Sequence, residues 1–180
     1  ERYCFPAEVK LVDGGTQGLY LLPEVTGARD LIVFDAVDFG LAPGTLHVLE
    51  DGDVPAWGAV KMSMHQSSFH EVLAVAKLSG RFPEKLVLIG VQPAELADFG
   101  GSLSAPVRAR LDEAVEIAAA RLASWGLAGA RREAALAETE RLNAASIALS
   151  VYDSGRPAPE AACRIGDDRF LALRAQVEQR

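Results

Sequence analysis

Two short stretches of this chain combine residue types that could do chemistry. Residues 31–38 read LIVFDAVD, and residues 61–66 read KMSMHQ. The first is an apolar run that ends on Asp35 and Asp38, so it predicts a buried strand that brings carboxylates to its carboxyl end. The second places the imidazole of His65 just before a predicted helix. Ligands of open α/β sheets bind beyond the carboxyl ends of the strands, so Asp35 and His65 could begin a metal site.

Structural roles compete with this interpretation. An aspartate at the end of a strand often caps the next helix or accepts hydrogen bonds from loop amides. A single histidine is more often a hydrogen-bonded polar residue than a metal ligand. The spacing alone leaves both interpretations open.

A further candidate is the loop of residues 13–18, which reads DGGTQG. Two adjacent glycines permit positive φ and close backbone approach, so this loop could line a cleft or cradle a phosphate. It matches neither GxGxxG nor the GK[ST] of a P-loop. The alternative is a tight turn between a strand and a helix, in which Asp13 accepts hydrogen bonds from backbone amides.

Other signals for catalysis are weak or absent from the sequence. His47 lies within a predicted strand, where it faces solvent or a neighbouring side chain, and His70 lies about 140° around a helix from His65. The chain has no HExxH or GxSxG motif, and neither Cys4 nor Cys163 has a histidine nearby in sequence. Zinc-protease and triad chemistry therefore have no support.

Composition places the chain among ordinary globular proteins. It has 180 residues, of which 49% are hydrophobic and 24% charged, and a net charge of −7. That charge argues against nucleic acid as a partner and gives no help to membrane-surface binding. No apolar run is long enough for a transmembrane helix, and two distant cysteines read as free thiols in a reducing compartment. We expect a cytoplasmic monomer.

Hydrophobic patterning predicts strands alternating with helices. The strand candidates are residues 7–13, 31–35, 45–49 and 85–91, and the helix candidates are residues 18–26, residues 67–80 and a long helix from Ser104. This alternation predicts an α/β fold, a three-layer sandwich with a sheet between helices. Residues 45–49 are expected to be antiparallel, because the connection before them is too short for a crossover helix. We expect a domain over residues 1–126 and a partly helical C-terminal extension without strands over residues 127–180.

Five motifs occur in the order and spacing of the nickel–iron hydrogenase maturation proteases. They are Asp13-Gly14-Gly15-Thr16, Asp35-Ala36-Val37-Asp38, Pro43-Gly44-Thr45, Ser63-Met64-His65-Gln66 and Leu88-Ile89-Gly90-Val91-Gln92-Pro93. Over residues 1–125 the chain therefore resembles this family. The resemblance implies a five-stranded, twisted, mostly parallel sheet between helices. It also implies an endopeptidase that removes a C-terminal peptide from the hydrogenase large-subunit precursor after nickel insertion.

The resemblance further implies roles for individual residues. Asp35 and His65 match two of the three side chains that recognise nickel, which the precursor carries as part of the substrate. The third, a glutamate after an opening strand, has no counterpart in this chain. Asp13 and Asp38 are the candidate catalytic carboxylates, which could polarise water or steer the peptide. Whether cleavage depends on the metal or on a carboxylate stays open.

The unmatched glutamate leads to an expectation about the functional protein. We expect it to begin before Glu1, so that residues 1–180 alone fold poorly and lack protease activity, whereas a longer chain recovers both. A fully active 180-residue chain would instead require another carboxylate, such as Asp38 or Glu95, to complete the site.

Two functions from other classes stay open at this point. The chain could be a non-catalytic module that checks its partner for nickel. It could also be a phosphate- or nucleotide-binding α/β domain that uses Gly14 and Gly15. Stabilisation by nucleotides without stabilisation by divalent metals would favour the second alternative.

Overall fold

A computed structural model describes residues 2–15, 18–54, 64–95, 102–134, 136–137, 140–143 and 148–155. Within residues 64–68 it describes the backbone and not the side chains. The chain divides into two compact units, Glu1–Ala94 with Leu103–Leu142, and Glu95–Ser102 with Asn143–Arg180. The first unit contains the sheet and the candidate site.

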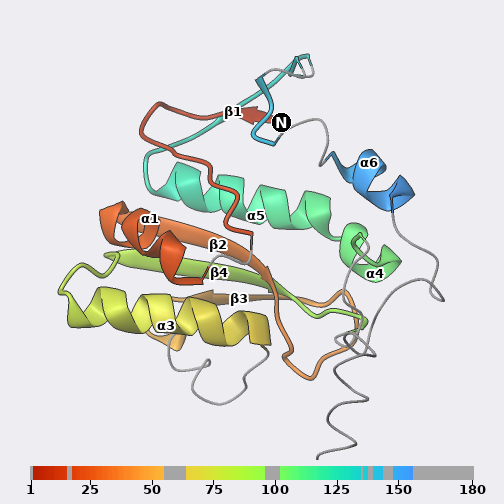
Figure 1. Ribbon diagram of the computed structural model, residues 1–180. Coiled ribbons are helices and arrows are strands. Elements are labelled where there is room, and N and C mark those ends of the chain that lie inside the picture. The colour runs from red at the N-terminus through yellow and green to blue at the C-terminus, as the bar shows by residue number, and fades with distance from the viewer. Residues whose placement is uncertain are drawn as a thin grey trace, which may run out of the picture. The chain divides into compact units, whose positions relative to one another are not determined.

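The main sheet has the strand order β2-β4-β3 (Figure 1). β2 (Asp30–Ala36) pairs in parallel with β4 (Lys85–Val91), with Asp30 opposite Lys85 and Ala36 opposite Val91. β3 (Leu46–Glu50) pairs antiparallel with the other edge of β4. The expected strands near residues 31–35, 45–49 and 85–91 are confirmed, as is the antiparallel direction of β3.

Helices cover both faces of this sheet (Figure 1). α1 (Leu22–Gly27), preceded by the 3-10 helix η1 (Gly18–Leu21), and α3 (Met64–Leu78) pack on one face, and α5 (Leu111–Ser124) packs on the other. Successive residues of a strand point to opposite faces. Accordingly, Leu86 and Leu88 join the cluster under α1 and α3, whereas Val87 and Ile89 join the cluster under α5. The predicted three-layer α/β fold is confirmed.

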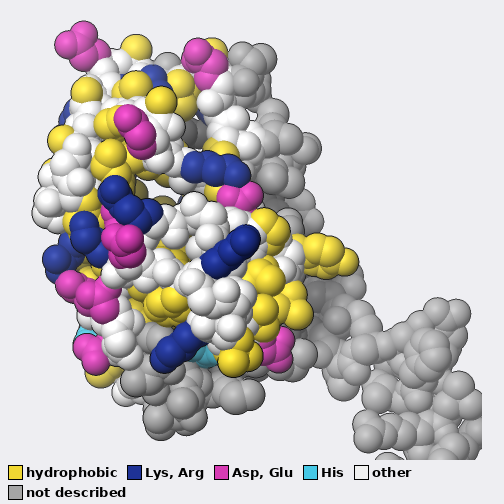
Figure 2. Space-filling view, turned by 90° about the vertical axis from the view of Figure 1, so that its left-hand side faces the viewer, with side chains coloured by type: hydrophobic (Ala, Val, Ile, Leu, Met, Phe, Trp, Pro, Cys, Tyr) yellow, Lys and Arg dark blue, Asp and Glu magenta, His cyan; other side chains and the backbone are white. Residues whose placement is uncertain are grey.

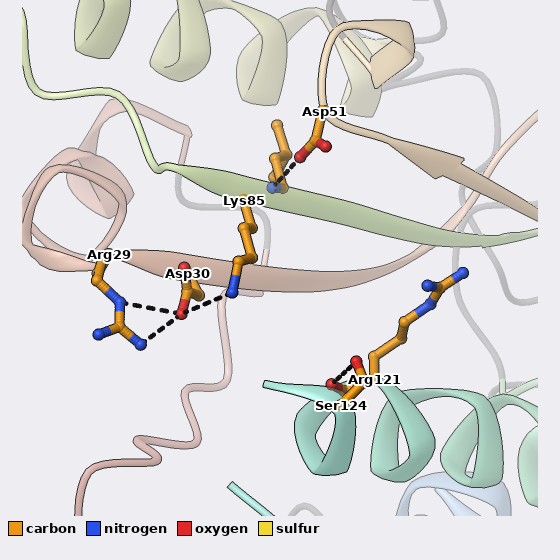
Figure 3. A network of polar contacts seen from close by, with 7 residues as sticks. Arg29, Asp30, Asp51, Lys85, Arg121 and Ser124 are labelled. Atoms are coloured by element: carbon orange, nitrogen blue, oxygen red, sulfur yellow. Dashed lines mark hydrogen bonds and ion pairs between the residues drawn. The ribbon is translucent and has the colours of Figure 1, made fainter. Parts of the chain in front are cut away.

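Polar contacts fix the edge of the sheet at which β2 and β4 begin and β3 ends (Figure 3). The Asp30 side chain is 5% exposed, and its Oδ2 accepts hydrogen bonds from Arg29 Nη2 at 2.7 Å and Nε at 3.0 Å, with Lys85 Nζ at 4.0 Å. The Leu86 N–H donates to Asp51 Oδ1 at 3.0 Å, just after the end of β3. These groups hold the end of the sheet opposite to the candidate site.

A two-stranded ribbon lies outside the main sheet. β1 (Tyr3–Cys4) pairs antiparallel with β5 (Ala130–Arg131), and the Tyr3 hydroxyl donates to Glu116 of α5 at 2.7 Å. The expectation of no strand after residue 126 is therefore wrong. A strand of two residues is too short to show a periodic sequence pattern. β5 forms because the backbone of β1 provides its hydrogen-bond partners.

Two shorter helices complete the described elements. α4 (Ala105–Arg108) precedes α5, so the helix expected to run on from Ser104 is interrupted at residues 109–110. α6 (Leu149–Ser154) lies in the second unit, within the expected C-terminal extension. The domain boundary at residue 126 stays a prediction.

The strand expected over residues 7–13 is wrong. A turn closes there through Val9 N–H and the Pro6 carbonyl at 3.0 Å, and the described chain offers no strand alongside. A strand needs a hydrogen-bonded neighbour, so an apolar sequence alone does not make one. Leu11 and Val12 remain 54% and 45% exposed. Exposed hydrophobic side chains also gather on the face of the molecule drawn in Figure 2. The main sheet has three strands in the described residues, compared with the five that the resemblance implies.

The burial of β4 generates a test of the core. Leu86→Ala should lower the free energy of unfolding by about 2–5 kcal/mol, because Leu86 is 0% exposed and its truncation leaves a cavity. Leu78→Ala is the matched control, since Leu78 is 88% exposed and its loss should change stability by less than about 0.5 kcal/mol. Urea unfolding of both variants measures the difference. Equal losses would contradict the assignment of β4 to the core.

Candidate active site

The carboxyl ends of β2 and β4 bring Asp35 to the edge of the sheet. Asp35 is the last residue but one of β2, where it lies opposite Gly90 of β4. Its half-buried carboxylate accepts a hydrogen bond from the Ala36 N–H at 2.8 Å. The strand therefore delivers Asp35 to the edge at which the sequence predicted a ligand site.

His65 lies in the first turn of α3 and not just before the helix, because the helix begins at Met64. Residues 79–84 lead from the end of α3 directly to the start of β4, so the helix runs antiparallel to that strand. The first turn of α3 therefore lies toward the carboxyl ends of β2 and β4 (Figure 1). The His65 side chain is outside the described residues, so its convergence with Asp35 stays a prediction.

Asp38 lies in the loop that follows β2, residues 37–44, which we call the Asp38 loop. The loop starts with the buried Val37, whose N–H donates to the Val91 carbonyl at 2.9 Å and extends the parallel pairing by one step. Asp38 Oδ1 accepts hydrogen bonds from the Gly40 N–H at 2.9 Å and from Gln92 Nε2 at 3.2 Å. The Asp38 carboxylate is thus held against its own loop and against the residue that follows β4.

Gln92 is a residue of this site for which no role was predicted from its type or spacing. The residue is 5% exposed, and its Oε1 accepts hydrogen bonds from the N–H groups of Phe39 at 2.7 Å and Leu41 at 3.1 Å. The available signal was a polar residue directly after an apolar run, residues 86–91. That signal indicates burial of an amide but does not identify its partners.

Two glycines let the Asp38 loop pack closely. A Cβ added to Gly90 would lie 2.6 Å from the Phe39 ring, so the ring occupies the space above the strand. Gly44 has a φ of +80°, and an added Cβ would lie 2.7 Å from the Pro106 carbonyl oxygen of α4. Glycine is required at both positions, for space at Gly90 and for space and backbone conformation at Gly44.

The Phe39 ring also meets an imidazole. It packs edge-to-face against His47 of β3, with the ring centroids 4.9 Å apart. His47 is exposed at the middle of the strand, so the expectation that it faces solvent or a neighbouring side chain is confirmed.

The Asp13 side chain forms a hydrogen bond within its own loop. Its exposed carboxylate accepts a hydrogen bond from the Gly15 N–H at 3.0 Å, as expected of a tight turn. Residues 16–17 of the loop lie outside the described residues. Among the described side chains, no three of the types His, Cys, Asp and Glu lie close enough together to hold a metal ion, so Asp13, Asp35 and Asp38 do not form such a group.

His70 of α3 is a titratable group whose pKa the fold changes. Its burial lowers the pKa of the imidazole below the ordinary histidine value, because desolvation disfavours the charged form. His70 is therefore neutral at neutral pH.

In the part of the chain that the structure describes, no helix is long and apolar enough to cross a membrane.

Comparison with known proteins gives consistent matches. Residues 1–121 match the family described as hydrogenase maturation protease. The hydrogenase expression/formation protein HoxM of Azotobacter vinelandii is 55% identical over 172 residues, which cover 95% of this chain and 82% of that protein. The hydrogenase expression/formation protein HupD of Thiocapsa roseopersicina is 52% identical over 179 residues, which cover 98% of this chain and 81% of that protein.

A solved structure also matches. The hydrogenase maturating endopeptidase HybD from E. coli is 37% identical in the matched region, which covers 73% of this chain and 81% of that chain. The TM-score between the two is 0.68. The likeness therefore extends to the fold that positions the site.

The close approach at Gly90 generates a test of the Asp38 loop. Gly90→Ala should displace the Phe39 ring and lower the free energy of unfolding by about 1–3 kcal/mol, the usual cost of overpacking. Hydrogen exchange at the Phe39 and Leu41 amides should accelerate, because the loop shifts from its acceptor. Gly27→Ala is the control, since nothing lies within 4 Å of its added Cβ. Unchanged exchange in Gly90→Ala would contradict the described packing.

Proposed function

This chain belongs to the hydrogenase maturation protease family and is a peptidase, and we propose that it removes the C-terminal peptide from the nickel-loaded large-subunit precursor of a hydrogenase. The observation that carries the proposal is the family match over residues 1–121. All four candidate site residues, Asp13, Asp35, Asp38 and His65, lie within that match. We further propose that the chain acts in the cytoplasm as a monomer.

Nickel enters the proposed reaction as part of the substrate. Nickel accepts imidazole nitrogen and carboxylate oxygen as ligands, and these are the groups that His65 and Asp35 supply. The path of the chain supports their convergence, because β2 ends and α3 begins at the same edge of the sheet. Recognition of the metal by these two residues would fix the precursor, and with it the peptide bond to be cleaved.

The rate of cleavage then depends on how the peptide bond is positioned relative to the catalytic group. A peptide bond held in a fixed geometry beside a catalytic group reacts as an intramolecular system, and this effect can supply about 7–11 kcal/mol of barrier reduction. We assign Asp38 or Asp13 to the polarisation of water or the steering of the peptide. Asp38 has the stronger support, because hydrogen bonds from Gly40 and Gln92 hold its carboxylate at the edge where Asp35 lies.

The assignment of His65 is directly testable. His65→Ala should slow cleavage of the nickel-loaded precursor by at least about 100-fold, equivalent to roughly 2.7 kcal/mol, because one of the few groups that recognise the metal is lost. We expect the fold to persist, since the buried residues of α3 in the described chain, Val72, Leu73 and Ala76, lie in later turns than His65. Precursor cleavage followed by electrophoresis, with circular dichroism of the variant, measures both.

His70→Gln is the matched control for His65→Ala. It changes the other histidine of α3 and should leave the cleavage rate close to that of the wild-type protein. Cleavage by His65→Ala at the wild-type rate would remove His65 from the site.

A further inference from the structure

Gln92 is buried directly after β4 and belongs to a motif to which the proposed chemistry gives no task. It is 5% exposed. A primary amide this deeply buried is costly unless its donors and acceptors are satisfied. Its partners therefore indicate what the residue holds in place.

All the partners of the Gln92 side chain are compatible with one orientation of the amide. Oε1 accepts from the N–H groups of Phe39 at 2.7 Å and Leu41 at 3.1 Å, which can only donate. Nε2 donates to Asp38 Oδ1 at 3.2 Å and to the Pro93 carbonyl at 3.4 Å. The Pro93 carbonyl and the ionised Asp38 carboxylate can only accept. The amide thus uses two acceptor positions and two donor hydrogens, its full capacity.

The backbone of Gln92 holds the far end of the same loop. Its N–H donates to the Thr45 carbonyl at 2.9 Å, and its carbonyl accepts from the Gly44 N–H at 2.8 Å. One residue therefore fixes the Asp38 loop in its middle, through the side chain, and at its exit into β3, through the backbone.

We propose that Gln92 is a positioning residue for peptide cleavage, which fixes the Asp38 loop and holds the Asp38 carboxylate at the carboxyl ends of β2 and β4. The proposal rests on the proposed function, which gives Asp38 a substrate. A glutamate at this position would keep the size and the accepting oxygen but lose the donor. A methionine would keep much of the volume and lose both. Glutamine therefore meets a requirement that neither of these side chains meets.

The decisive variant is Gln92→Glu, because it converts the contact with Asp38 into a pH-dependent one. Two facing carboxylates repel when both are ionised, whereas a single shared proton lets one donate to the other. At about pH 7.5, kcat/KM for the nickel-loaded precursor should fall by about tenfold to hundredfold. Burial and the neighbouring charge both raise the pKa of such a pair. Lowering the pH to about 5.5 should therefore recover kcat/KM at least about threefold relative to the wild-type protein at the same pH.

Two further variants separate positioning from stability. Leu86→Ala weakens the core at the opposite end of β4, so it should lower the melting temperature but keep the wild-type kcat/KM at temperatures where it is folded. Gln92→Met should lose activity as Gln92→Glu does at neutral pH, with no recovery in acid. This pattern across the three variants would support the proposal.

Other outcomes would overturn it. Wild-type kcat/KM in folded Gln92→Met would show that the amide positions nothing that the reaction needs, even if Gln92→Glu fails to fold. An equal loss of kcat/KM in Leu86→Ala would reduce Gln92 to a structural residue. Failure of the natural full-length wild-type protein to cleave the nickel-loaded precursor would overturn the proposed function itself. That outcome is distinguishable because it does not depend on any change at residue 92.

Discussion

The candidate site depends on the burial of β4. This strand is covered by helices on both faces and paired with a strand on both edges, and its apolar side chains alternate between the two hydrophobic clusters. Its pairing fixes the register of β2, so that Asp35 lies opposite Gly90 at the carboxyl end. The position of the candidate metal-recognising carboxylate is therefore a consequence of the core and not of local chemistry.

Different kinds of polar contact hold the two ends of β4. At the amino end, Arg29 and Lys85 pair with Asp30, whose carboxylate is buried while the two cations reach solvent. At the carboxyl end, Gln92 forms directional hydrogen bonds out of contact with solvent, where the loss of one partner costs most. The end that carries the candidate site is thus held by several hydrogen bonds from one buried amide.

Sequence predicted the elements whose signal is local. The apolar runs identified β2, β3 and β4, and the short connection before β3 identified its antiparallel direction. Prediction from the sequence was wrong where an element depends on a distant partner. Residues 7–13 are apolar but have no neighbouring strand in the described chain. β5 is too short to show a sequence pattern. The contacts of Gln92 join residues more than fifty positions apart. No spacing rule connects them until the fold is known.

The motifs that carry the family resemblance therefore divide into two physical classes. Some supply chemical groups, as the aspartates and His65 do. Others contain no acid or base that the reaction could use, yet Gly90 leaves space for Phe39, Gly44 adopts a positive φ beside Pro106, and Gln92 binds the loop between them. Each of these residues acts on the same eight-residue loop. A carboxylate is useful in catalysis only if it is held in one place, and in this protein the second class of motif residue supplies that restraint on Asp38.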